Sequence, residues 1–206
     1  MDQANLAARY LNHHFGIQTT ESSTRSMTRK SSKDQNGGEA TLADLTAEAL
    51  IVPRLVGRDT LSVIQELSKV LQKAGCVQDL LPFYTAAMNR EFLVGTVLES
   101  GIAFPHARIQ GLTRVHFALG RCDPPVVWGL KGGLPVQLVF LVAAPATDAT
   151  GYLGLVSALV RLSCNGELVE QLRRGSGAGA IRDTLRRVTL NGSGALTPHR
   201  LQSVTA

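Results

Sequence analysis

Hydrophobic residues recur every three or four positions between residues 59 and 75, as they do on the buried face of an amphipathic helix. Asp59 is a favourable N-cap for this helix, and Gly75 is a favourable stop. A second helix is predicted over about residues 79–90, which places Arg90 and Glu91 at its C-terminal end. The apolar positions of the first helix are Leu61, Ile64, Leu67 and Leu71.

Short apolar runs rich in β-branched residues predict the strands. Ile51-Val52 is a strand candidate, and Pro53 directly after it favours the edge of a sheet. Gly101 to Phe104 is typical of a buried strand that Pro105 ends, so that His106 stands at the strand's end. Further strands are predicted over Val115 to Leu119, Val126 to Trp128 and Val136 to Ala143.

The second half of the chain adds three predicted helices. Asp148 can cap a helix over 149–162, and two more helices are expected over 166–174 and 178–188. The glycines of 175–180 superficially match a dinucleotide-binding fingerprint, but they follow an Arg-rich helix and not a strand, so we interpret them as a loop and N-cap. Strands alternating with helices predict an α/β sandwich, with a central mixed β-sheet flanked by helices on both faces.

The pattern predicts one folded domain with polar flanks. Residues 1–40 contain a possible short helix from Leu6 to Phe15 and then a Ser-, Thr- and Lys-rich stretch with little to bury, so we expect this segment to be disordered. The domain is expected over 45–188, and residues 189–206 are expected to form a flexible tail.

Composition excludes several classes of protein. With 206 residues and 44% hydrophobic content, the chain can form one sizeable globular domain. Its three widely spaced cysteines favour a reducing cytoplasm over a disulfide framework or a zinc site. The longest apolar run, 134–144, is too short to cross a bilayer as a helix, so no membrane insertion is expected. A net charge of +5 with only 5% aromatic residues and scattered cations does not favour a nucleic-acid partner.

His106 is the strongest candidate for chemistry. A neutral imidazole near pH 7 suits proton transfer, metal ligation or acceptance of a phosphoryl group. The spacing alone leaves open whether His106 is reactive or makes one ordinary hydrogen bond. The adjacent His13 and His14 point different ways on a helix and have no further ligand nearby, and His116 is expected to be structural.

Three segments carry a specific resemblance. They are Arg90-Glu91 through Gly95-Thr96, Gly101 through Arg108, and Leu134 through Leu141. Their order of an Arg-Glu pair, a Thr, a glycine and then Gly-hydrophobic-Ala-hydrophobic-Pro-His resembles the IIA component of the bacterial phosphotransferase system, of the fructose/mannitol and nitrogen-regulatory class. The similarity runs from about residue 45 to residue 188.

The resemblance implies a cytoplasmic phosphotransferase that needs no cofactor or metal. His106 would accept a phosphoryl group from the phosphohistidine of HPr, or of its nitrogen-branch equivalent, and pass it to a sugar-specific IIB component. Arg90 would stabilise charge on the phosphoryl oxygens, Arg108 would add a second cation or be a plain surface residue, and Thr96 would donate a hydrogen bond. The alternative is a regulatory, nitrogen-type interaction protein whose phosphorylation at His106 controls partner binding. The sequence does not indicate the oligomeric state or the sugar.

One position departs from the family pattern. The family usually has a second histidine near the start of the helix after the long strand, and Tyr152 stands there. A phenol can donate a hydrogen bond to a phosphoryl oxygen, but it does not become a cation near pH 7. Tyr152 therefore either assists the transfer through its hydroxyl or only packs at the helix start, and a protein with a binding role alone is a further alternative.

Overall fold

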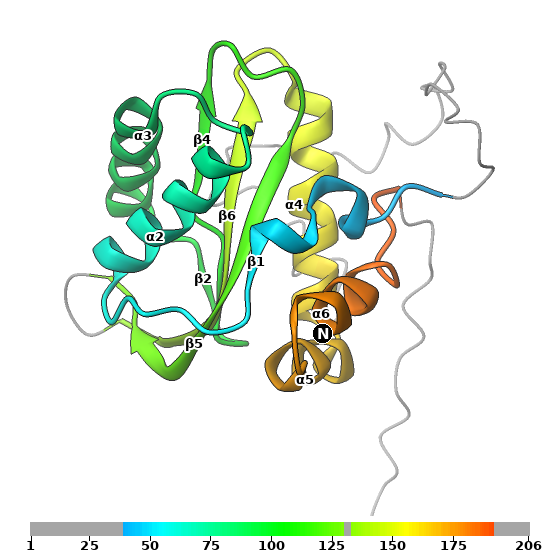
Figure 1. Cartoon of the computed structure of the whole chain (residues 1–206). Coiled ribbons are helices and arrows are strands. Elements are labelled where there is room, and N and C mark those ends of the chain that lie inside the picture. The colour runs from blue at the N-terminus through cyan, green and yellow to red at the C-terminus, as the bar shows by residue number, and fades with distance from the viewer. Residues whose placement is uncertain (1–38, 130–132, 192–206) are drawn as a thin grey trace, which may run out of the picture.

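A computed structural model describes residues 39–129 and 133–191, and the strands within these residues form one sheet between two layers of helices (Figure 1). After two short 3-10 helices, Leu42–Leu45 and Glu48–Leu50, the elements are β1 (Ile51–Val52), α2 (Thr60–Lys73), α3 (Leu80–Leu93), β2 (Val97–Leu98), β3 (Ile102–Ala103), β4 (His106–Ile109), β5 (His116–Val127), β6 (Pro135–Pro145), α4 (Ala149–Ser163), α5 (Gly166–Arg174) and α6 (Ala178–Leu185). The predicted α/β sandwich is confirmed.

β6 is the central strand of a mixed sheet. The order of the strands is β1-β5-β6-β3-β2, and β4 also pairs with β6. β5 runs antiparallel to β6, while β3 and β4 follow one another along its other side, both parallel to it. β1 lies at the edge beside β5, where the sequence predicted it, because Pro53 cannot donate to a further strand.

The two faces of β6 belong to two separate hydrophobic clusters. Leu138, Phe140 and Val142 pack with the C-terminal helices α4, α5 and α6, and the alternate residues Val139 and Leu141 pack with α2 and α3. In Figure 1 these two groups of helices lie on opposite sides of the sheet. A strand covered on both faces needs a continuous apolar sequence, which β6 has.

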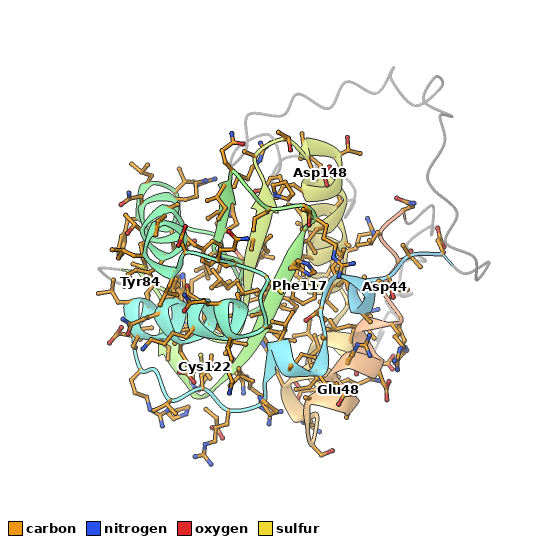
Figure 2. The ribbon with its side chains drawn as sticks, turned by 45° about the horizontal axis from the view of Figure 1, so that its top comes forward. Asp44, Glu48, Tyr84, Phe117, Cys122 and Asp148 are labelled. Atoms are coloured by element: carbon orange, nitrogen blue, oxygen red, sulfur yellow. The ribbon has the colours of Figure 1, made fainter. Side chains whose placement is uncertain are left out.

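Two phenylalanine side chains fill the interior between the sheet and the C-terminal helices α4, α5 and α6. Phe117 of β5, labelled near the centre of the molecule in Figure 2, and Phe140 of β6 have ring centroids 5.6 Å apart and tilted planes. Both side chains are fully buried. This tilted arrangement is one that aromatic pairs favour, and it joins the two central strands beneath α4.

Side-chain caps fix where the helices begin. Asp59 accepts a hydrogen bond from Ser62 N, and Asp148, labelled at the start of α4 in Figure 2, accepts one from Gly151 N, each at 2.8 Å. The predicted caps of α2 and α4 are confirmed, as is the loop and N-cap ending at Gly177. α3 ends at Leu93, three residues later than predicted, because no helix-breaking residue precedes Gly95.

One predicted pair of strands is a single strand. The sequence separated 115–119 from 126–128, but β5 is continuous from His116 to Val127. Its register against β6 shifts between Arg121 and Val126, where Pro124 and Pro125 cannot donate to the ladder. The prolines interrupt the pairing with β6 without ending the strand.

The two ends of the domain meet. Thr41 forms a β-bridge with Thr189, and Leu190 N donates to Ala40 O at 2.7 Å, so these first residues of the predicted tail pair with the start of the domain. The helix predicted over 6–15, the rest of residues 1–38 and residues 192–206 lie outside the described residues. Among the helices that the structure describes, none has the length and apolarity to cross a membrane.

Candidate functional site

His106 is the first residue of β4, which corrects its predicted place at the end of the preceding strand. β3 stops at Ala103, and Pro105 separates it from β4 as proline should. The carbonyl of Pro105 then accepts a hydrogen bond from Val142 N at 2.9 Å, which restarts the pairing with β6. The histidine is therefore held inside the sheet and is 5% exposed.

The His106 imidazole is oriented by a backbone carbonyl. Its Nδ1 lies 3.2 Å from Phe104 O, and because a carbonyl can only accept, Nδ1 carries the proton in this contact. The lone pair of the neutral ring then resides on Nε2. Burial is the largest of the effects that lower the pKa of His106 from 6.5 to about 4. The charges of Arg90 and Arg108 lower this pKa further, whereas the hydrogen bond to Phe104 raises it.

Arg90 reaches the site from the last turn of α3, a helix that packs against β4. It is half-buried, and its Nη1 donates to Val94 O at 3.0 Å. Its charge acts on both His106 and Tyr152, in each case lowering the pKa. Arg90 is therefore near enough for its charge to act on the imidazole.

Arg108 and Tyr152 lie on the same side of the sheet as His106. Arg108, two residues along β4, is exposed, and its Nη2 donates to Ala146 O at 2.7 Å. The Tyr152 ring, from the first turn of α4, lies 5.4 Å from the His106 ring and 5.6 Å from the Arg108 guanidinium carbon, measured to its centroid. Burial raises the pKa of the Tyr152 phenol, so it stays neutral at pH 7.

The hydroxyl of Thr96 is engaged by Glu91. Thr96 is fully buried, and its hydroxyl donates a hydrogen bond to Glu91 Oε2 at 2.6 Å. Glu91 also accepts a hydrogen bond from Trp128 Nε1 at 2.8 Å. Neither Glu91 nor Trp128 was predicted from the sequence to belong to the site, although Glu91 is part of the Arg-Glu pair of the motif.

No metal site is indicated among the described residues, where no group of three His, Cys, Asp or Glu side chains is arranged to hold an ion. His116 begins β5, and its Nε2 accepts a hydrogen bond from Arg114 Nε at 3.1 Å. The three cysteines are free thiols. His13 and His14 lie outside the described residues. Of the two histidines within the described residues, His106 and His116, His106 remains the candidate for chemistry.

The His106 ring is expected to titrate near pH 4 in an NMR titration, with His106→Gln identifying its signals. The unfolded chain protonates this residue near 6.5, so the folded state binds fewer protons between pH 6.5 and 4. The free energy of unfolding should therefore fall by about 1.4 kcal/mol per unit as the pH falls through this window, and this contribution is fully retained above 6.5. The His106→Gln variant should lack this pH-dependent part of the free energy of unfolding. A midpoint near 6.5 in the folded protein would contradict the burial argument.

The chain is similar in sequence to known proteins. Residues 44–188 match the family described as phosphoenolpyruvate-dependent sugar phosphotransferase system, EIIA 2. The chain is 29% identical over 145 residues to a nitrogen regulatory protein of Bradyrhizobium diazoefficiens, covering 70% of this chain and 94% of that protein. It is 30% identical over 144 residues to the fructose-specific EIIABC component of Bacillus subtilis, covering 70% of this chain but only 23% of that longer protein.

Solved structures share the fold. The nitrogen regulatory protein IIA-Ntr from Neisseria meningitidis superposes with a TM-score of 0.63 at 24% identity, covering 70% of this chain and 98% of that one. IIA mannitol of Escherichia coli, in a complex with phosphorylated IIB mannitol, superposes with a TM-score of 0.58 at 18% identity, covering 68% and 95%. The fold is thus that of a phosphotransferase-system IIA domain. The chain belongs to the EIIA 2 family of the phosphoenolpyruvate-dependent sugar phosphotransferase system.

Proposed function

We propose that this chain is a cytoplasmic phosphocarrier that accepts a phosphoryl group on His106 from phospho-HPr, or from its nitrogen-branch equivalent, and passes it to a IIB component. The observation that carries the proposal is the state of the imidazole. Its Nδ1 proton is held by Phe104 O, burial keeps the ring neutral at pH 7, and the charges of Arg90 and Arg108 act on it. A neutral ring with a fixed Nδ1–H presents the Nε2 lone pair as a nucleophile.

The transfer then needs no cofactor. The Nε2 lone pair of His106 forms a bond to phosphorus as the P–N bond to the donor's histidine breaks, and the electron pair of that bond returns to the donor ring. His106 keeps its Nδ1 proton, and the positive charge that develops on its ring strengthens the hydrogen bond to Phe104 O. Passing the group to a IIB component reverses these changes.

The arginines stabilise the group in transit. Phosphoryl transfer depends mainly on positioning and on neutralising charge on the equatorial oxygens. The guanidinium of Arg90 is suited to two of these oxygens, and Arg108 supplies a second charge from the exposed side of β4. Thr96 contributes through Glu91 and not by touching the phosphoryl group, because its hydroxyl donates to that carboxylate.

Reconstituted transfer tests this function. The protein is incubated with phosphoenolpyruvate, the general phosphotransferase enzyme and HPr, and is then mixed with IIB proteins of the fructose and mannitol class. We expect one acid-labile phosphoryl group per chain, which leaves the chain when a matching IIB protein is added. Failure of both HPr and its nitrogen-branch equivalent to label the chain would contradict the proposal.

A regulatory role is the second candidate, and the nitrogen regulatory relative favours it, since the match covers 94% of that protein. In this role His106 would be labelled by the nitrogen-branch donor, but no IIB protein would remove the label. The phosphorylated and unmodified forms would instead bind a target protein with different affinities. The IIB step of the transfer assay therefore separates the two functions.

Nucleic acid is not among the proposed partners. Several arginines in or just after α5 and α6 form ion pairs with acidic neighbours, as Arg174 does with Glu170 at 2.6 Å and Arg187 with Glu167 at 3.7 Å. A phosphate-binding track needs cations free to replace counterions. The ion pairs support the interpretation of these helices as a solvated surface.

Substitutions at Tyr152 separate catalysis from packing. Tyr152→Phe keeps the buried ring beside His106 and removes only the hydroxyl. If the hydroxyl takes part in the transfer, this variant should transfer more slowly, because its activation free energy rises by about 0.5–3 kcal/mol. Tyr152→His restores the family's residue, and we expect faster transfer or a longer-lived phosphohistidine. Rates are measured with phospho-HPr as donor. Wild-type rates in both variants would place Tyr152 outside the reaction.

A further inference from the structure

Glu91 is a buried carboxylate to which the proposed reaction gives no direct task. It lies in the last turn of α3 and is 4% exposed. Burying a carboxylate is unfavourable, and a negative charge near a helix C-terminus is also opposed by the helix dipole. None of the ion pairs found within residues 39–129 and 133–191 includes Glu91. A carboxylate in this position must therefore be stabilised by hydrogen bonds.

Three donors converge on Glu91. Its Oε1 accepts from Thr96 N at 2.9 Å and from Trp128 Nε1 at 2.8 Å, while its Oε2 accepts from the Thr96 hydroxyl. Both donor residues are buried, so little water competes for these bonds. Hydrogen bonds to an ionised group in such surroundings are strong and directional. They fix Thr96 and Trp128 to the end of α3.

Thr96 continues the network to His106. The carbonyl of Thr96 accepts a hydrogen bond from Phe104 N at 3.3 Å, and the carbonyl of Phe104 accepts the Nδ1 proton of His106 at 3.2 Å. Glu91 is thus connected to the imidazole by three successive hydrogen bonds, which the backbones of Thr96 and Phe104 link. A shift of Thr96 would move Phe104, whose carbonyl sets the tautomer and the direction of the ring.

The same turn holds Arg90. Val94 lies between Glu91 and Thr96 in the chain, and its carbonyl accepts from Arg90 Nη1 at 3.0 Å. The bonds from Thr96 back to Glu91 close this turn, so they also fix the position of the Val94 carbonyl. Glu91 is therefore connected to two carbonyls of the site. One is that of Val94, which accepts from Arg90, and the other is that of Phe104, which accepts from His106.

We propose that Glu91 is a positioning residue that holds Arg90 and His106 in their relative orientation for phosphoryl transfer, and that Trp128 fixes Glu91 for this task. The inference rests on the proposed phosphocarrier function. Glu91 acts through Thr96 and Phe104 and does not touch the phosphoryl group. Such indirect positioning matters because a displacement of about 1 Å at a reacting centre can lower a rate on the order of a hundredfold.

Four variants of the 206-residue chain test the proposal. Glu91→Leu has a similar volume but accepts no hydrogen bond, while Glu91→Gln keeps an oxygen for Thr96 N and Trp128 Nε1. Trp128→Phe and Thr96→Val each remove one donor and keep most of the buried shape. We expect kcat from phospho-HPr to fall at least about tenfold in Glu91→Leu, with KM within about threefold of wild type because the docking surface is unchanged. Glu91→Gln should restore most of the rate, and the two donor variants should be intermediate.

NMR follows the same network without any phosphoryl transfer. The sequence contains one tryptophan, so one indole N–H signal reports directly on the bond to Glu91. We expect this signal to shift and to exchange faster with solvent in Glu91→Leu and to stay close to its wild-type position in Glu91→Gln. The His106 ring, in a long-range proton–nitrogen spectrum, should be the Nδ1–H tautomer in wild type and a mixture of tautomers in Glu91→Leu.

The outcomes separate this inference from the function on which it rests. A folded Glu91→Leu protein with wild-type kcat, or one whose His106 ring signals are unchanged, overturns the positioning role. If Glu91→Leu does not fold, an unchanged rate and an unchanged His106 ring in both Trp128→Phe and Thr96→Val overturn it. If wild type accepts no phosphoryl group at all, the phosphocarrier function fails, and the tautomer measurement still decides whether Glu91 orients His106.

Discussion

His106→Ala is expected to abolish labelling by phosphoenolpyruvate, the general phosphotransferase enzyme and HPr. The imidazole supplies the nitrogen that bonds to phosphorus, so its removal leaves no acceptor in the site. The loss should reach the detection limit of the assay, because the remaining groups of the site stabilise a phosphoryl group but cannot carry it as a phosphoramidate. The measurement is acid-labile phosphate per chain, since lability in acid marks a P–N bond and not a phosphoester.

His116→Ala is the matched control for this experiment. His116 is a half-buried histidine at the start of β5, hydrogen-bonded to Arg114, and it lies outside the proposed network. This variant should be labelled like wild type. Label that persists in His106→Ala and maps to another histidine would show that the acceptor has been assigned wrongly.

Arg90→Ala should lower the rate of transfer ten- to a thousandfold, on the order expected when an arginine that stabilises developing phosphate charge is lost. Arg90→Lys should recover only part of the rate, because an ammonium keeps the charge but not the planar fork. Folding should be little affected, since a half-buried cation at a helix C-terminus contributes about 1 kcal/mol or less. The rates are measured by rapid mixing with phospho-HPr.

Arg174→Ala provides the control for a change in net charge alone. Its side chain is 80% exposed on α5 and is paired with Glu170, away from the imidazole. It should transfer at the wild-type rate. Equal rates for wild type and Arg90→Ala would leave Arg90 with only its interaction with the helix dipole.

The sequence predicted the elements that have strong local signals. The periodic apolar residues and the Asp59 cap located α2, and Asp148 located the start of α4. The apolar run from Val136 to Ala143 predicted the strand β6. These features depend on residues within a few positions of each other, so a pattern in the sequence is sufficient to reveal them.

Local signals were misleading where pairing with a distant strand decided the structure. The sequence predicted two separate strands, over 115–119 and 126–128, yet β5 continues because β6 pairs with it on both sides of Pro124 and Pro125. Pro105 ended one strand as predicted, but hydrogen bonds to Val142 began another at His106. In both cases the partner strand lies many residues away, and a single-strand pattern contains no information about it.

The motif in the sequence supplied His106, Arg90 and Thr96 as candidates, and it placed Tyr152 where the family has a histidine. Only the tertiary structure decided how they meet. Tyr152 contacts His106 because the turn after β6 returns α4 across the sheet, and Glu91 meets Trp128 across 37 positions of the chain. Residue types and short spacings limit the possible chemistry, but the burial that keeps His106 neutral and the bonds that orient it arise from packing between distant segments.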